Sequence, residues 1–487
     1  MNIRYYTLTL LLLTGCAAGP DFKSPDTPAV DQYTHVDLTA TVEEQPQLVM
    51  QDNIPDQWWQ LFESQTLTEL VEKGLSKSPT LAAAEAKLRA AQETLSADTG
   101  TLLYPTIDLP LSSSRQKISG ATFGNAGNPS VFTVNNASIA VSYDISLLGA
   151  GQRYIEASQA QVDFVSYQLE AARQTLATNI VTTALTEASL REQLTAMNAI
   201  IEDETDVLNV IEKQFAIGVI PKADLLNQRS ALAQARAQLP ALQKALAQSR
   251  NQLAVLTGDF PTSNDTLPRI QLDALTMPGQ LPITLPSTLT QRRPDVRAAE
   301  ELLHQANAQV GVATANLYPR LTLSANYSTE ASVFGDLFSA GTAVWGLAAG
   351  LTQPLFHGGE LRAKKRAAIA NFDQAAAQYR QSVLIAFQDV ANALLALNTD
   401  SKQLNLQKEV ELLATETLVL VREQYKHGAV SYLNLLTAQR NFQQARINLI
   451  RARVALYNDT AALMYALGGN WDIQHSNTTD QTTEKTS

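Results

Sequence analysis

Two segments of this chain repeat one pattern around a glycine, and this repeat constrains the fold more than any other feature. The first reads Gln214-Phe215-Ala216-Ile217-Gly218-Val219 and the second reads Gln424-Tyr425-Lys426-His427-Gly428-Ala429. The two glycines lie 210 residues apart (428 − 218), and so do the leucine pairs that follow them, Leu225-Leu226 and Leu435-Leu436. We therefore expect one structural unit present in two copies, so that any fold must account for both together.

Alternating hydrophobicity predicts two strands in each copy. In the first copy, apolar residues alternate with small and polar ones from Ser138 to Leu147, and a shorter stretch interrupted by Pro110 precedes them. In the second copy the same alternation occupies Arg320–Ser328 and Trp345–Leu351. Because successive strand residues face opposite sides, each strand has one apolar face. We predict hairpins at about 106–147 and 320–356, with a soluble sandwich as the alternative for four such strands.

Each hairpin leads into a very long stretch of helix-forming residues. We predict long helices at 152–217 and 362–427, each about 66 residues and about 100 Å long. The second helix has the 3,4 spacing of a coiled coil, at Ile369, Phe372, Ala376, Tyr379, Val383, Ala386, Val390, Ala393 and Leu397. Tip turns at 218–221 and 428–430 follow, and then return helices at 222–257 and 431–467. The expected object is a helical rod with strands at one end and both turns at the other.

The two ends of the chain carry different signals. Residues 1–15 have the short apolar run of a signal peptide, and they end at Cys16, the only cysteine. We predict that Cys16 carries diacylglycerol and an N-palmitoyl group, with a chance lone cysteine as the alternative. Residues 16–55 are expected to form an extended, lipid-anchored segment, and 472–487 a disordered tail. The remaining domains are a first repeat at 56–257, an equatorial inter-repeat segment at 258–290 and a second repeat at 291–471.

Enzymatic chemistry has little support in the sequence. The histidines are scattered, without the paired spacing of a metal site, and no second cysteine is present. Gly149-x-Gly151 lacks the third glycine of a nucleotide-binding loop. A formal net charge of −11 without basic clusters disfavours nucleic acid. We therefore expect no enzyme, no catalytic residues, no metal and no cofactor beyond the lipid at Cys16.

The strands then pose a problem of closure. No apolar run after the signal peptide reads as long enough for a membrane-spanning helix. An exported chain with alternating strands has one other way to cross a membrane, which is a closed barrel, because an open sheet edge leaves backbone groups unsatisfied in lipid. Four strands are too few to close one. The barrel must therefore be completed by further copies of the chain.

Five motifs, in order along the chain, resemble the OprM-like lipoprotein branch of the TolC family of outer-membrane factors. They are Gln57-Trp58-Trp59-Gln60-Leu61-Phe62, Arg293-Pro294-Asp295-Val296-Arg297-Ala298-Ala299-Glu300, Ala313-x-Ala315-Asn316-Leu317-Tyr318-Pro319, Tyr425-x-x-Gly428-x-x-x-Tyr432-Leu433-x-Leu435-Leu436-x-Ala438-Gln439-Arg440 and Ala466-Leu467-Gly468-Gly469-Asn470-Trp471. The resemblance covers essentially the whole mature chain. It implies a mixed α+β membrane fold in which each chain supplies one third of a trimeric twelve-stranded outer-membrane β-barrel, continuous with a periplasmic α-helical barrel.

The resemblance also implies a function and its partners. The chain is expected to be the exit duct of a tripartite efflux system in the outer membrane of a Gram-negative bacterium, passively conducting small molecules such as drugs. Its partners would be two further copies, a periplasmic adaptor, outer-membrane lipid, and an inner-membrane pump of RND, MFS or ABC type. Type I protein secretion and a non-conducting envelope scaffold are the alternatives.

By the same resemblance, Leu433, Asn434, Thr437 and Arg440 are expected to form a gate at the periplasmic end. Family members carry acids matching Asn434 or Thr437, so the resemblance implies a polar iris narrowed by leucine here, in place of an acidic ring; the alternative is that Thr437 is an ordinary exposed residue. The adaptor is expected to dock on the tips, at Gly218, Val219, Leu225, Leu226, Gly428, Leu435 and Leu436. For those leucines the alternative is the coiled-coil seam.

Overall fold

The computed structural model describes residues 17–30, 32–34, 46–50, 54–119, 129–262 and 267–469. The predicted signal peptide, Cys16 and the predicted tail lie outside these residues. The chain divides into two compact units. The sheet unit comprises the chain up to Pro25, Lys87–Ser166 and Ala298–Arg380, and the helix unit comprises Asp26–Ala86, Tyr167–Arg297 and the chain from Gln381.

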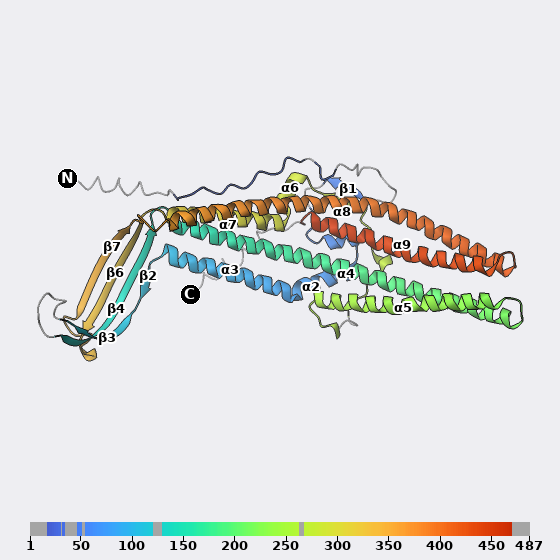
Figure 1. Cartoon of the computed structure of the whole chain (residues 1–487), viewed down its shortest axis with the longest axis horizontal. Helices are drawn as coiled ribbons and strands as arrows, with labels where there is room; N and C mark the ends of the chain where they lie inside the picture. The colour runs from blue at the N-terminus through green and yellow to red at the C-terminus, as the bar shows by residue number, and fades with distance from the viewer. Residues whose placement is uncertain are drawn as a thin grey trace, which may run out of the picture. The chain divides into compact units, whose positions relative to one another are not determined.

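The order of the elements repeats, as the sequence pattern predicts (Figure 1). The strands are β1 (Gln47–Met50), β2 (Thr106–Asp108), β3 (Leu111–Ile118), β4 (Ser130–Ser146), β5 (Gln280–Ile283), β6 (Arg320–Ala331) and β7 (Ala343–Thr352). The α-helices are α2 (Gln65–Lys77), α3 (Pro79–Leu103), α4 (Ala150–Ala216), α5 (Lys222–Leu256), α6 (Pro286–Arg292), α7 (Pro294–Ala315), α8 (Glu360–Lys426) and α9 (Tyr432–Ala466). The helices α4 and α8 have 67 residues each.

The main sheet has four strand positions formed by five segments. Its order is β2-β4-β6-β7, and β3 also pairs with β4. Both β2 and β3 keep one register with β4, since Ile107 pairs with Val141 and Leu111 with Ala137. Between them, the Ser138 N–H donates to the Pro110 carbonyl at 3.1 Å. Proline lacks the N–H that would complete this pair, so it interrupts a strand that is otherwise continuous.

The register sorts side chains onto two faces. Apolar residues occupy successive cross-strand rows, such as Ile139–Tyr327–Trp345 and Val141–Ala325–Leu347. The intervening rows are small or polar, such as Ser142–Ser324–Ala348. In the single chain the apolar face is uncovered, with Trp345 71% and Leu347 76% exposed. The predicted alternation is therefore confirmed, and one face requires an apolar environment.

In the helix unit, the return helices of both copies end against a break between two helices. The α2–α3 break meets Gly258 (φ +76°), where a Cβ would lie 2.6 Å from the Lys77 carbonyl oxygen. The α6–α7 break meets Gly468 (φ +85°), where a Cβ would lie 2.9 Å from the Arg292 carbonyl oxygen. Only glycine accepts both the positive φ and the close approach. The duplication therefore extends to the packing.

The Arg293-Pro294-Asp295 motif stabilises the break between α6 and α7. The Arg293 guanidinium binds the Asp295 carboxylate through two contacts, at 2.9 and 2.7 Å. It also pairs with Asp389 of α8 at 3.0 Å and donates to the Ala466 carbonyl of α9 at 3.2 Å. Because this buried cation has paired acids, its pKa is raised despite the cost of burial. The motif therefore joins three helices.

The coiled-coil seam of α8 is partly as predicted. Tyr379, Val383, Ala386 and Val390 are buried, whereas Ile369 is 41% exposed. Among the described residues, α8 also contains an 18-residue window of mean hydropathy 1.3, of which 39% is buried. By length and composition it meets a criterion for a membrane span, contrary to the expectation that no such run exists. The long coiled-coil seam of α8 is rich in alanine and leucine, and these residues raise the mean hydropathy of the window to the value used for membrane spans.

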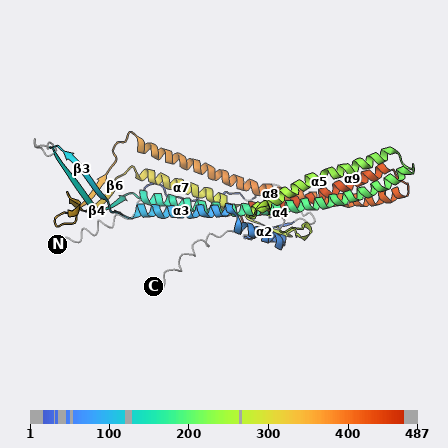
Figure 2. The same ribbon diagram turned by 90° about the horizontal axis from the view of Figure 1, so that it is seen from below.

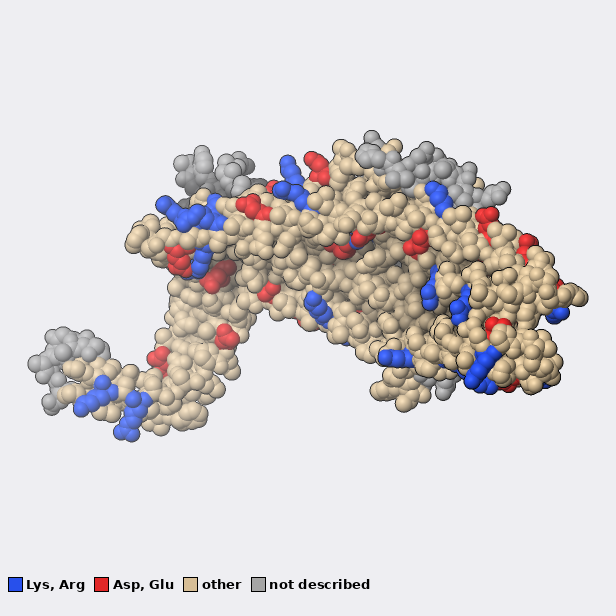
Figure 3. Space-filling view, turned by 45° about the vertical axis from the view of Figure 1, so that its right-hand side comes forward, with Lys and Arg blue, Asp and Glu red and all other residues tan. Residues whose placement is uncertain are grey.

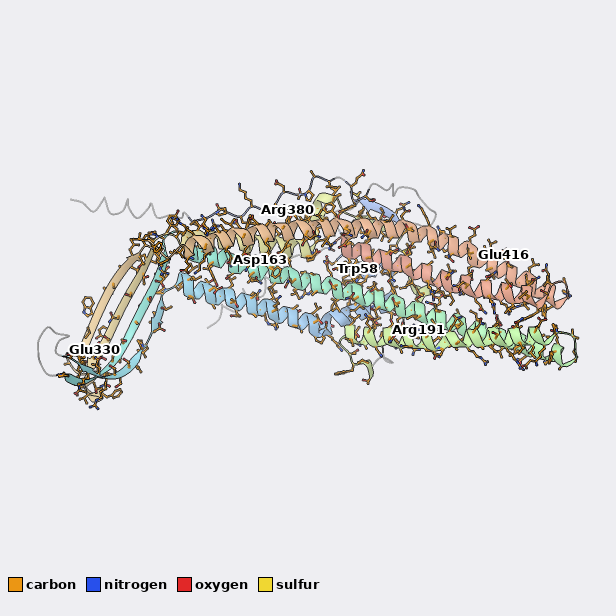
Figure 4. All side chains as sticks on the ribbon, in the orientation of Figure 1. Trp58, Asp163, Arg191, Glu330, Arg380 and Glu416 are labelled. Carbon is orange, nitrogen blue, oxygen red and sulfur yellow. The ribbon has the colours of Figure 1, made fainter. Side chains whose placement is uncertain are left out.

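Two features of the helix unit have no counterpart in the sequence prediction. The segment predicted to be extended contributes β1, which pairs in parallel with β5 of the inter-repeat segment, Gln47 opposite Gln280. After it, a 3₁₀ turn at Trp58–Phe62 places Phe62 edge-on to Tyr457 of α9, with ring centroids 5.7 Å apart. Figure 4 labels Trp58 in this region. The Tyr457 hydroxyl donates to the Leu275 carbonyl at 2.8 Å, so the inter-repeat segment packs on α9.

The described N-terminal residues of the sheet unit lie where β4 turns into α4. The Ala18 N–H donates to the Leu148 carbonyl at 2.9 Å. Arg153 of α4, only 5% exposed, donates to the Ala18 carbonyl at 3.3 Å and pairs with Asp21 at 2.5 Å. Ala17 therefore lies beside the end of the sheet, next to the predicted lipidation site.

Candidate functional site at the helix tips

Both hairpins of the helix unit turn in the same way. The hairpin α4–α5 turns at Gly218 (φ +75°) and α8–α9 at Gly428 (φ +71°). In each, the N–H after the glycine bonds back five residues, Val219 to Gln214 at 3.0 Å and Ala429 to Gln424 at 2.9 Å. This is a Schellman cap, which needs a left-handed residue and satisfies the last helical carbonyls. The repeated glycines therefore have a defined backbone role.

The leucines that follow the turns divide into buried and exposed sets. Leu225, Leu435 and Leu436 are 6%, 3% and 3% exposed and pack between the helices. Their burial removes them from the predicted set of surface contacts and matches the seam alternative. Tertiary packing explains the difference: Leu225 and Leu436 pack together between the two hairpins, and Leu435 packs against Leu418 of α8 within its own hairpin. Val219 and Leu226 remain 66% and 52% exposed. Ile217, which the sequence reasoning missed, is 76% exposed in the same turn.

The predicted gate residues share one exposed face of α9. Leu433, Asn434, Thr437 and Arg440 are all exposed, and Leu433 is 62% exposed. The Thr437 hydroxyl donates to the Leu433 carbonyl at 2.8 Å, so it is satisfied within its own helix. The neighbouring residues of α9 that are buried, Tyr432, Leu435 and Leu436, determine which face of the helix is exposed.

A buried polar network, which the sequence reasoning missed, joins the two hairpins below the tips. Gln228 of α5 is fully buried and donates to the Glu204 carboxylate of α4 at 2.6 Å. From α9, the Tyr432 hydroxyl donates to Gln228 Oε1, and Gln443 donates to the second Glu204 oxygen at 3.0 Å. The signal available in the sequence was an acid, Glu204, at a seam position of a coiled coil.

Burial sets the electrostatics of this network. Desolvation raises the pKa of Glu204, although hydrogen bonds from Gln228 and Gln443 and the charge of Arg440 oppose the rise. Desolvation, followed by the charge of Glu204, raises the pKa of Tyr432 well above its ordinary value. Tyr432 therefore stays a hydrogen-bond donor at physiological pH. The network holds the hairpins together through the buried contacts of Gln228 with Glu204 and Tyr432 and the partly buried contact of Gln443 with Glu204.

No group of three or more His, Cys, Asp or Glu side chains within the described residues could hold a metal ion. At the tips the charged side chains form simple surface pairs, such as Lys426 with Glu423 at 2.7 Å. The tips therefore present two tight turns, exposed apolar side chains such as Val219 and Leu226, and one exposed face of α9.

Comparison with known proteins places this geometry in a family. The model of the family described as "Outer membrane efflux protein" matches residues 70–259 and 285–469. The pyoverdine export outer membrane protein OpmQ of Pseudomonas putida is 30% identical over 428 residues, covering 86% of this chain and 89% of that protein. The probable efflux pump outer membrane protein TtgC of Pseudomonas putida is 28% identical over 486 residues, covering 98% of each.

A solved structure of the outer-membrane channel OprN superimposes with a TM-score of 0.86 at 28% identity, covering 94% of this chain and 100% of that one. The predicted fold is confirmed: each chain supplies one third of a trimeric barrel that continues into a helical tunnel. The expected outer-membrane location is confirmed as well. The chain therefore belongs to the outer membrane efflux protein family and serves as an efflux duct of the outer membrane.

Proposed function

We propose that three copies of this chain form a passive exit duct for small molecules, fed by a periplasmic adaptor and an inner-membrane pump. The observation that carries the proposal is the sheet register, which gives one apolar face and one small, polar face across the strands β4, β6 and β7. An elongated scaffold needs no such polar face, whereas a water-filled barrel does. The similar proteins named for pyoverdine export and for efflux support small molecules as the cargo.

The polar face also has a charge. Its charged residues in the described strands are Asp108, Asp144, Glu330 and one cation, Arg320. Two acids are oriented by neighbours across the register, since Thr322 donates to Asp144 at 2.6 Å and Asn136 to Glu330 at 3.1 Å. A lumen lined in this way favours neutral and cationic solutes over anions.

The exposed α9 face is the proposed gate. In a trimer, three copies of Leu433 would narrow the aperture, with Asn434 and Thr437 supplying polarity and Arg440 a positive charge. Opening requires the α8–α9 hairpin to move relative to α4–α5, and the Glu204–Gln228–Tyr432 network opposes this movement. The closed state would thus be held by buried polar contacts and the open state by the adaptor.

The proposed docking surface for the adaptor is the tip itself. Gly218 and Gly428 set the turns, and the exposed Val219 and Leu226 supply apolar contacts. Leu225, Leu435 and Leu436 would support this surface from below without touching the partner. In the sheet unit, we propose that lipid on Cys16 anchors the chain, because the neighbouring Ala18 is bonded to Leu148, just after β4.

Conductance of the purified protein in planar bilayers tests the proposal. Wild type is expected to be closed most of the time, and Leu433→Ala or Arg440→Ala to raise the open fraction. Both side chains are exposed, so neither change should cost more than about 0.5 kcal/mol of stability. Leu226→Ala is the matched control, with unchanged conductance and weaker adaptor binding. A protein that conducts in none of these forms would be a scaffold.

A further inference from the structure

Two cations, Arg115 and Lys117, lie on the apolar face of the sheet, near the end of β3 and opposite the start of β4. The register pairs Arg115 with Thr133 and Lys117 with Val131. Residues 131 and 133 are separated from Ile139 and Val141 by even numbers of positions along β4, so they share the face of the apolar rows. Both cations are exposed, and neither has an ion-pair partner among the described residues. Figure 3 shows basic side chains gathered at this end of the sheet.

The two faces of the sheet differ in the charges that they carry. In the described strands β2, β3, β4, β6 and β7, Arg115 and Lys117 are the only charged residues on the apolar face. Every acid of these strands is on the opposite face, including Glu330, which Figure 4 labels at the end of β6. An outward surface that carries cations alone suits an anionic neighbour.

The position of Arg115 and Lys117 along β3 indicates which anionic group lies next to them. Apolar rows run from Ile145 to Ala137, a span of eight residue-to-residue steps (145 − 137), or about 21 Å along the membrane normal at a strand tilt of about 40°. Ser113 then bonds to Asn135 at 2.7 Å, and this polar pair ends the apolar band. Arg115 and Lys117 follow about 10 and 16 Å beyond the band, at the height of the outer-leaflet headgroups. Their long stems can reach back toward the lipid surface.

We propose that Arg115 and Lys117 bind phosphate groups of a phosphorylated glycolipid in the outer leaflet. Guanidinium and ammonium groups are the usual phosphate partners, and the apolar rows just below would seat the acyl chains of the same molecule. The inference rests on the outer-membrane location of the family and does not depend on conduction. The ligand is thus held at two places, a charged one and an apolar one.

Lipid retention by purified trimers tests this. Native mass spectrometry in detergent would follow binding of lipid A that carries its phosphates, beside dephosphorylated lipid A and inorganic phosphate. Wild type should retain only the phosphorylated lipid. Lys117→Gln should weaken retention roughly fivefold, and Arg115→Gln combined with Lys117→Gln roughly thirtyfold. The matched control is Arg320→Gln, which removes a cation from the opposite face and should change nothing.

Each contrary result overturns the proposal in a recognisable way. Equal retention of dephosphorylated lipid would mean that the apolar rows alone bind it. Equal binding of inorganic phosphate would mean a free-anion site. Loss of trimers from the double variant before any lipid is added would mean that the cations pair with a neighbouring chain. Conductance recorded on the same samples separates all these outcomes from a failure of the proposed duct.

Discussion

Tyr432→Phe tests whether the buried network holds the hairpins in the closed arrangement. The hydroxyl of Tyr432, a residue only 4% exposed, donates to Oε1 of Gln228, which is fully buried. Phenylalanine keeps the ring and its edge-on contact with Tyr425, whose centroid is 6.2 Å away. The change therefore removes one hydrogen bond and little else. Figure 2 shows the hairpins α4–α5 and α8–α9 that this bond joins.

The size of the expected effect follows from the acceptor that loses its donor. Gln228 Oε1 becomes a buried acceptor without a donor, which costs about 1 to 3 kcal/mol per chain. If opening separates the hairpins and lets water reach Gln228, the closed state alone bears this cost. The ratio of closed to open should then fall roughly 5- to 150-fold for each chain.

Tyr425→Phe is the matched control, because it also removes a tyrosine hydroxyl that joins the hairpins. That hydroxyl donates to Gln214 Oε1 at 3.0 Å in a partly exposed setting. Water can replace the donor there, so the expected cost is about 0.5 kcal/mol, or about a twofold change.

Single-channel recording in planar bilayers measures the open fraction of both variants, and thermal unfolding followed by circular dichroism reports stability. We expect a large rise in open fraction for Tyr432→Phe and a small one for Tyr425→Phe. Equal open fractions in the two variants would refute the reasoning. So would a lower melting temperature for Tyr432→Phe with unchanged gating, because the network would then stabilise the fold alone.

Two further predictions concern the helix unit. Burial and the neighbouring Asp400 raise the pKa of Asp459 from 3.8 to about 7, so the folded chain binds more protons than the unfolded chain and stability falls as pH rises across that window. Asp459→Asn should therefore stabilise the protein by about 1–2 kcal/mol at pH 8, since solvent screens the half-buried carboxyl, and by little at pH 4; a gain that is the same at both pH values in thermal melts would contradict this. Gly428→Ala should cost only about 1 kcal/mol, the strain of a positive φ in open space. Gly468→Ala should cost more because its Cβ meets the Arg292 carbonyl, and equal melting temperatures for the two alanine variants would rule out the packing argument.

Local sequence patterns were enough to predict much of this fold. The period of two in Ser138–Leu147 and the 3,4 spacing from Tyr379 to Val390 depend only on which side chains must leave water. A positive φ at Gly218 and Gly428 follows from the absence of a Cβ. These signals are local, and they are repeated in two copies, which is why strands, long helices and tip turns could be placed before any packing was known.

Contacts between distant segments could not be read in this way. Nothing local distinguishes the buried Leu436 from the exposed Leu226, because the two occupy the same position of the repeat. The parallel pairing of β1 with β5 joins segments more than 200 residues apart. Glu204 occupies a seam position of its helix, but its sequence neighbours do not show that Gln228 of α5 and Gln443 of α9 donate to its carboxylate.

By itself, then, the sequence determined the duplicated unit, its alternating strands, its long helices and the need for further copies to close the sheet, since periodicity and backbone hydrogen bonding act over a few residues. Tertiary structure alone decided which tip residues are available to a partner, which polar groups join the two hairpins, and that the outward cations Arg115 and Lys117 stand apart from the inward acids. Those properties depend on which segments pack against each other and in what register, and a few residues of sequence do not specify that.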